Sequence, residues 1–182
     1  VFAPGDAGVE ARTAWCYGDL GAAIALVRAA AALQDDRWLE RGVALARASA
    51  SRPHDACGVQ DAGLCHGAAG LGHFLNRLYQ ATGDVVVGDG ARRWFRDTLQ
   101  RRNSEYLAGF PSYTHGAMPG RPAGWASDPS ILTGAAGVGL ALMSAVGACP
   151  GWDQCLLTDL PPTSRRAAEV GTTTHPTSSG RG

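Results

Sequence analysis

Three segments of the chain share one pattern of small and apolar positions. Each has two leading residues, a glycine, two further residues, a second glycine and then an apolar stretch with few charges. Glycine is unfavourable inside a helix, so its recurrence at each start indicates a close backbone approach there. Self-similarity at a spacing of tens of residues predicts a repeat architecture. The segments start at Cys16, Cys65 and Leu132 and read CYGDLGAAIALVRAA, CHGAAGLGHFLNRLY and LTGAAGVGLALMSAV.

Amphipathic, charged helices are expected between these segments. Residues Asp35 to Ala50 place apolar side chains at helical spacing among charges, with acidic residues at the start and Pro53 beyond the end. A second such helix is expected from Asp89 to Arg102. Uncharged helices are buried on most sides and amphipathic ones on one side, so the alternation predicts an inner and an outer ring of helices. The run Val85 to Val87 is too short to carry a sheet, and an all-α fold is expected.

Two stretches lack helical periodicity. Residues 101–129 hold four prolines and four glycines, which predicts a long functional or mobile loop. From about Pro161 the chain is poor in large apolar side chains and rich in Ser, Thr, Gly and Pro. The expected organisation is therefore one domain over residues 1–160 and a disordered tail over residues 161–182. His175 in the tail has no evident role.

Composition narrows the class of protein. The 16 basic residues, all of them arginine, balance 16 acidic ones, which argues against nucleic acid as the main partner. No uncharged apolar stretch is long enough to span a membrane, and VFAPGDAGVE at the start lacks the features of a signal peptide. A cytoplasmic location is therefore expected. The five cysteines are an odd number, so free thiols or metal ligands are expected rather than disulfides.

Cys16 and Cys65 occupy the same position in the first two repeats, and His66 follows Cys65. If the repeats pack as neighbouring inner helices, their leading residues lie at one end of the assembly and these three side chains converge. Adjacent residues of a helix point about 100° apart, but in a loop closed by Gly67 both Cys65 and His66 can reach one metal. The third repeat has no metal-ligating residue at the matching place.

Two cysteines and one histidine form a ligand set of catalytic zinc, with the fourth position open. Cys57 is an alternative fourth ligand, which would make the site structural, although it lies outside the repeat register. A thiol that enters the open position loses its proton, and the negative charge of the site keeps its sulfur nucleophilic and disfavours hydroxide. Thiol alkylation or conjugate addition is therefore the preferred reaction. Cys57, Cys149 and Cys155, taken singly, are expected to be small buried hydrophobes.

The repeat motifs resemble those of the lanthionine synthetase C-like cyclases. The resemblance covers about the first 160 residues in family order. It implies an α/α toroid of inner and outer helices, of which this chain forms an incomplete C-terminal arc, with one zinc held by Cys16, Cys65 and His66. The matching stretches are WCYGDLG from Trp15, LCHGAAGLG from Leu64, PSILTGAAGVGLAL from Pro129 and, at the family's C-terminal segment, PGWDQCLL from Pro150.

The activity implied by the resemblance is the addition of peptide cysteine thiols to dehydroalanine or dehydrobutyrine. The substrate would be a dehydrated precursor peptide, and the products lanthionine or methyllanthionine rings. Partners of the chain would then be this peptide and either a dehydratase or the missing N-terminal half of the ring, whose absence leaves inner helix faces exposed.

The chain departs from the family pattern at several points. Leu20 stands where the family often has proline, and an Asp and a His of the family's N-terminal half have no counterpart here. His115, in YTHGAMPG, is a candidate replacement for proton transfer, with an ordinary loop histidine as the alternative reading. Trp15 and Tyr17 are candidate substrate-binding residues, with core packing as the alternative. His73, on an apolar helix face, is expected to serve packing.

Two other functions are compatible with these residues. A non-catalytic module could keep the zinc and bind a cysteine-containing peptide or glutathione. A helical-toroid carbohydrate enzyme would need paired carboxylates at the loop ends, and Asp19 is the only acidic residue in the three motifs. The cyclase, or its C-terminal part, is therefore the preferred function.

Overall fold

The computed structural model describes residues 11–116, 122–147 and 151–163. Predictions about the first ten residues, Cys149, His175 and the tail beyond residue 163 lie outside this part of the chain. Of the predicted tail, residues 161–163 are described, and Thr163 donates its backbone N–H and its hydroxyl to the carbonyl of Ala81, both at 2.9 Å. Among the described helices, none combines the length and the apolar character needed to cross a membrane.

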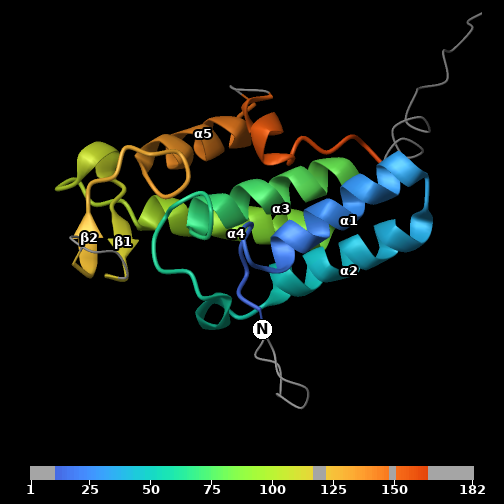
Figure 1. Ribbon diagram of the computed structural model, residues 1–182, viewed down its shortest axis with the longest axis horizontal. Coiled ribbons are helices and arrows are strands. Elements are labelled where there is room, and N and C mark those ends of the chain that lie inside the picture. The colour runs from blue at the N-terminus through green and yellow to red at the C-terminus, as the bar shows by residue number, and fades with distance from the viewer. Residues whose placement is uncertain (1–10, 117–121, 148–150, 164–182) are drawn as a thin grey trace, which may run out of the picture.

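Five α-helices form two layers: α1 (Asp19–Leu33), α2 (Asp36–Ser51), α3 (Ala68–Thr82), α4 (Val85–Gln100) and α5 (Ala135–Ala145). Helices α1 and α2 form one hairpin and α3 and α4 a second (Figure 1). In the inner layer α3 lies between α1 and α5, and in the outer layer α2 contacts α4. The predicted all-α fold, an arc of an α/α toroid, is confirmed. Its core lies between the layers around the fully buried side chains of Val27, Phe74, Leu75 and Trp94.

The outer helices begin at aspartate caps. The Asp35 carboxylate accepts the backbone N–H of Arg37 at 2.9 Å, so α2 spans nearly the range that the sequence predicts. The Asp84 carboxylate accepts the N–H groups of Val86 and Val87 at 3.1 and 3.2 Å. Helix α4 therefore starts at Val85, and its predicted start at Asp89 is wrong by one turn. The three valines belong to this first turn and not to a strand.

The long segment after α4 contains a β-hairpin that the sequence did not predict. Strands β1 (Ser112–Thr114) and β2 (Gly124–Ala126) pair antiparallel, with Tyr113 opposite Trp125. Each strand has only three residues, too few to show the alternation of apolar and polar positions on which strand prediction depends. The hairpin lies at the end of the molecule where α3 and α5 begin (Figure 1).

A buried polar cluster attaches the C-terminal segment to the inner layer. The fully buried Asp153 lies in the short helix η3 (Trp152–Leu156), and its carboxylate accepts hydrogen bonds from two α3 residues. His73 Nε2 lies 2.9 Å from it, and Arg77 bonds through Nε and Nη2 at 2.7 and 2.9 Å. Burial raises the Asp153 pKa, but the bonds from His73 and Arg77 outweigh burial and hold that pKa well below its usual range. His73, expected to serve packing, thus also makes a buried polar contact.

We expect His73 to make the stability of the protein pH-dependent. Burial lowers the His73 pKa more than Asp153 raises it, and its Nδ1 has no hydrogen-bond partner among the described residues. The unfolded chain therefore takes up this proton first as the pH falls. The stabilisation is complete above about pH 6.5 and is lost as the pH falls toward the folded-state pKa, with a slope of at most about 1.4 kcal/mol per pH unit.

This slope is measured by urea unfolding between pH 7.5 and 5 in the presence of a chelator, for the wild type and for His73→Gln. The glutamine amide can still donate to Asp153 but does not titrate, so the variant should show the flatter profile. Contributions of other histidines, His66 included, are common to both proteins and cancel in the comparison. Equal slopes for the two proteins would contradict the prediction.

Candidate metal centre

The turns that lead into the three inner helices have the same backbone structure. In each turn, the carbonyl six residues before the first glycine accepts the N–H of the residue after that glycine. A Cβ on either repeat glycine would overlap backbone atoms of the turn. The repeated glycines therefore serve the close backbone approach that the sequence indicated. The three bonds are Asp19 to Arg12 at 3.3 Å, Ala68 to Asp61 at 3.0 Å and Ala135 to Asp128 at 2.8 Å.

Backbone hydrogen bonds join the three turns to one another. Trp15 of the first turn donates its N–H to the carbonyl of Cys65 at 3.1 Å. Cys65 in turn donates its own N–H to the carbonyl of Leu132 at 2.7 Å. Cys65 thus lies in the middle of a ladder that spans all three repeats. The third repeat thus positions Cys65 of the second through its backbone.

Cys16, Cys65 and His66 come together where the first two turns meet. One ligand atom from each lies within 4.8 Å of the other two, and the cysteines are partly buried. Zinc binds sulfur at about 2.3 Å and nitrogen at about 2.0 Å, so ligand atoms around one ion lie roughly 4 Å apart. The donor set and its spacing therefore fit zinc. Cys16 lies before Gly18, the N-cap of α1, and Cys65 and His66 lie before Gly67, the N-cap of α3. All three ligands are therefore in loops, as the sequence predicts.

The electrostatics of the cluster favour neutral side chains unless a cation is bound. Burial, and then the hydrogen bond and charge of Cys16, raise the pKa of Cys65 to about 12. Burial, and then the charge of Arg12, lower the pKa of His66. Two thiolates in one half-buried site repel each other, so a divalent cation is the natural counter-charge that ionises both.

The other predicted site residues lie around this cluster. Tyr17 is 88% exposed and therefore lies outside the buried core. Trp15 is partly buried and stacks on Phe74 with ring centroids 6.3 Å apart, so it does contribute to the core. His115 is exposed and packs edge-on against Tyr113, with ring centroids 5.1 Å apart, and its charge contributes to lowering the pKa of His66.

Neither of the described extra cysteines joins the cluster. Cys57 is buried in the short helix η1 (His54–Cys57), where its thiol donates to the carbonyl of Pro53 at 3.3 Å. Burial raises the pKa of this thiol. Cys57 is thus a buried hydrophobe of the expected kind and not a fourth ligand in the described group. Cys155 is exposed instead of buried, because it lies on the outer side of η3.

Sequence reasoning missed two charged residues beside the cluster, Arg12 and Asp61. Both stand six residues before the first glycine of their repeat, a position that Asp128 holds in the third. The positive charge of Arg12 lowers the pKa values of both Cys65 and His66. Asp61 is buried, and its charge raises the pKa of His66. Extending the repeat alignment by six residues would have found both.

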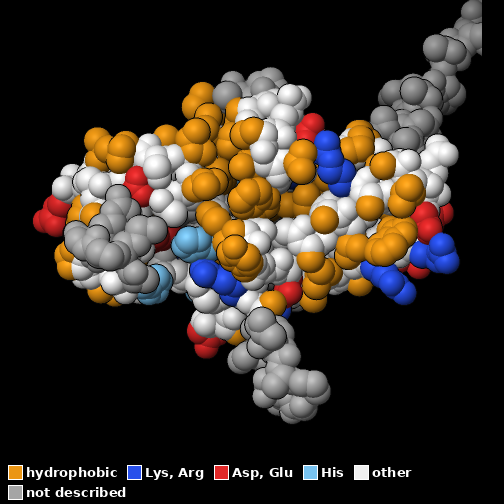
Figure 2. All heavy atoms as spheres, viewed as in Figure 1, with side chains coloured by type: hydrophobic (Ala, Val, Ile, Leu, Met, Phe, Trp, Pro, Cys, Tyr) orange, Lys and Arg blue, Asp and Glu red, His pale blue; other side chains and the backbone are white. Residues whose placement is uncertain are grey.

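A groove of about 690 Å³ begins at the cluster and follows α1. Trp15 and Cys16 line its start, Ala25 and Arg28 its middle, and Leu157 its opposite wall. Hydrophobic side chains gather over α1 and α5 on the face that Figure 2 shows. An apolar channel that leads to a partly buried thiol suits an extended peptide better than a small polar metabolite.

Comparison with known proteins identifies the family of the chain. A sequence model described as "Lanthionine synthetase C-like protein" matches residues 5–157. The solved structure of a "Nisin cyclase" is similar at a TM-score of 0.62 and 18% sequence identity, over 84% of this chain and 33% of that one. The chain thus spans about a third of the length of that protein. The comparison with curated proteins gave no match. The family resemblance of the repeats is confirmed, and the chain belongs to the lanthionine synthetase C-like family.

Proposed function

We propose that this chain is a zinc-dependent lanthipeptide cyclase or a part of one. It would join peptide cysteine thiols to dehydroalanine or dehydrobutyrine as lanthionine or methyllanthionine rings. The observation that carries the proposal is the convergence of Cys16, Cys65 and His66, whose ligand atoms lie within 4.8 Å of one another. The matching family sequence model and the cyclase-like fold support the same reaction class.

Each residue around the cluster has a proposed role. Cys16, Cys65 and His66 hold the zinc, which when bound lowers the pKa of a thiol entering its open position. Trp15 and Tyr17 contact the peptide at the start of the groove, where Trp15 is fixed by Phe74 and Tyr17 is free to close over a ligand. His115 exchanges the proton with solvent, for which its exposure suits it. Its fixed neighbour Tyr113 limits where its imidazole can move.

The donor set favours thiol addition over hydrolysis. Two thiolates and a neutral imidazole cancel the charge of a divalent metal, and a third anion makes the site negative. Excess negative charge keeps an entering sulfur nucleophilic, whereas it weakens the acidity that a hydrolytic site demands of water. Arg12 limits this excess, because its guanidinium stabilises negative charge at Cys65.

We expect the purified chain to bind about one zinc per molecule and Cys65→Ala to lose it, because two remaining ligands make an incomplete site. Zinc content after dialysis is measured by inductively coupled plasma mass spectrometry. Cys155→Ala is the matched control, since this thiol is exposed and lies outside the cluster, and it should keep the metal. A wild-type chain without zinc, or a Cys65→Ala variant that retains it, would overturn the proposed site.

The second candidate function is a binding module that holds a cysteine-containing peptide or glutathione without reaction. The observation in its favour is that His115, the candidate proton-transfer group, is exposed and lies outside the group of three ligands. Mass spectrometry with a dehydrated precursor peptide separates the two functions. Cyclisation removes free thiols without changing the peptide mass, whereas a binder leaves the thiols titratable. Adding the remainder of the ring, or a dehydratase, to the same assay tests the proposed partners.

A further inference from the structure

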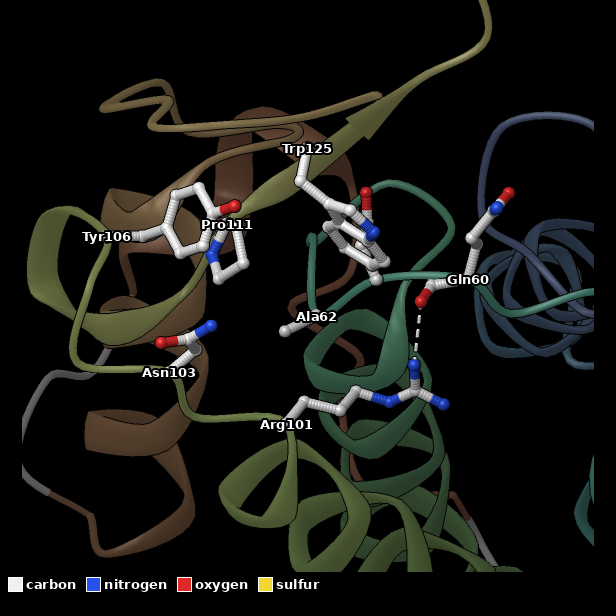
Figure 3. A pocket seen from close by; sticks show the side chains of 8 residues that line it. Gln60, Ala62, Arg101, Asn103, Tyr106, Pro111 and Trp125 are labelled. Carbon is white, nitrogen blue, oxygen red and sulfur yellow. Dashed lines mark hydrogen bonds between the residues drawn. The ribbon is translucent and has the colours of Figure 1, made fainter. Parts of the chain in front are cut away.

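A second cavity, of about 320 Å³, is lined by Gln60, Asp61 and Ala62, which precede Cys65 in the chain (Figure 3). It is also formed by the end of α4 and by the β-hairpin. No residue of the proposed metal site lines it. Its walls combine apolar faces with polar groups, and include Ala62, Arg101, Asn103, Tyr106, Pro111 and Trp125.

The polar groups of this cavity are held in fixed positions. The Arg101 guanidinium bonds to Asp97 through Nε at 2.5 Å and to the carbonyl of Gln60 through Nη1 at 2.7 Å, which leaves Nη2 outside these bonds (Figure 3). The side-chain oxygen Oδ1 of Asn103 accepts the backbone N–H of Glu105 at 3.0 Å, which leaves the Nδ2 hydrogens of Asn103 outside that bond. Arg101 and Asn103 thus present hydrogen-bond donors at the rim of the cavity.

The apolar walls are also preorganised. Trp125 is 48% exposed, and its ring packs edge-on against Tyr113 with centroids 5.2 Å apart. Tyr106 and Pro111 stand across the cavity from Trp125 (Figure 3). Rigid aromatic faces of this kind bind planar apolar groups at a low cost in conformational entropy.

One carboxylate joins this cavity to the metal centre. Asp61 lines the cavity, and its Oδ1 accepts the N–H of Gly63 at 2.9 Å in the turn that leads to Cys65. Its Oδ2 accepts the N–H of Tyr113 at 3.0 Å in the hairpin. The Tyr113 ring contacts both Trp125 and His115. Asp61 therefore fixes the turn that leads to Cys65 and the hairpin that lines the cavity relative to each other.

We propose that this cavity binds an aromatic side chain of the substrate peptide, near in sequence to the reacting cysteine. The ring would lie against Trp125 and Tyr106, and Arg101 and Asn103 would donate to the adjacent peptide carbonyls. The volume lies at the lower end of ligand pockets, which suits one side chain with its peptide groups. Asp97 neutralises Arg101, so the cavity does not select an acidic side chain. This inference rests on the proposed function, which makes a cysteine-containing peptide the substrate.

The test uses blocked peptides of sequence acetyl-Phe-(Gly)n-Cys-amide, with zero to four glycines, and the same series with Ala for Phe. Binding to the zinc-supplemented full chain is measured by calorimetry. At the spacing that matches the two sites, Phe should bind about tenfold more tightly than Ala, because linked sites add their binding free energies. Trp125→Ala should remove this preference, and so should Tyr106→Ala. Trp38→Ala, a partly exposed tryptophan on the outer helix α2, should preserve it.

Peptides with Ser in place of Cys separate this proposal from the metal site. If the thiol is not recognised, Ser and Cys peptides bind alike, but the preference for Phe over Ala and its loss in Trp125→Ala remain. If instead Phe and Ala peptides bind equally at every spacing, or Trp125→Ala keeps the preference, the aromatic subsite does not exist, whatever happens at the metal.

Discussion

Replacement of Gly70 by alanine is expected to destabilise the fold by at least about 3 kcal/mol and to abolish zinc binding. Gly70 is the second glycine of the second repeat, in the first turn of α3. A Cβ there would overlap the carbonyl of Leu64, the residue before Cys65. The obstacle is backbone, which cannot rotate away as a side chain can. The turn must therefore move, and with it the ligands Cys65 and His66.

The expected loss is opposite in sign to what helix propensity predicts. In a helix interior, alanine is favoured over glycine by about 1 kcal/mol. Gly139→Ala in α5 is the matched control, since a Cβ on Gly139 meets no atom within 4 Å. That variant should be neutral or slightly stabilised and should leave zinc content unchanged. Denaturant unfolding and metal analysis on both variants test the prediction, and a stable, zinc-loaded Gly70→Ala protein would contradict it.

The repeat is the part of the fold that the sequence shows best. Both repeat glycines are needed wherever the start of a helix packs against the turn that leads into it. The same glycine pattern therefore occurs three times in the sequence. Cys16 and Cys65 can be paired from the sequence alone because they hold the same place in that pattern. His66 follows from its position next to Cys65 and from the glycine that ends the turn.

Features that depend on contacts distant in sequence could not be predicted in the same way. Asp153 and His73 are 80 residues apart, and nothing local to either indicates the other. The hairpin has strands of three residues, and one bond that attaches it joins Tyr113 to Asp61, which are 52 residues apart. The start of α4 was missed for a different reason, because valines favour strands while the cap at Asp84 imposes a helix.

Replacement of Asp153 by alanine should also destabilise the protein strongly, because the Asp153 carboxylate accepts hydrogen bonds from His73 and Arg77 of α3. In Asp153→Ala, His73 stays fully buried without its partner, and the Arg77 guanidinium keeps only its bond to Gln80. Removing one partner of a buried ion pair costs about 3–5 kcal/mol, because the remaining partner loses its counter-charge and its hydrogen bonds. The segment of η3 should then detach from α3 and expose the apolar surface beneath Trp152.

Asp159→Ala is the matched control, because Asp159 also ties the C-terminal segment to an inner helix. Its partner Arg28 has a side chain that is 40% exposed, and their N–O distance of 2.8 Å is as short as those of the buried pair. The two pairs match in distance but differ in burial and in the number of hydrogen bonds that the carboxylate accepts, and an exposed pair contributes at most about 1 kcal/mol. Urea unfolding followed by tryptophan fluorescence measures both variants. If the two losses are equal, burial of the carboxylate is not what makes Asp153 important, and the attachment of η3 depends on its apolar contacts instead.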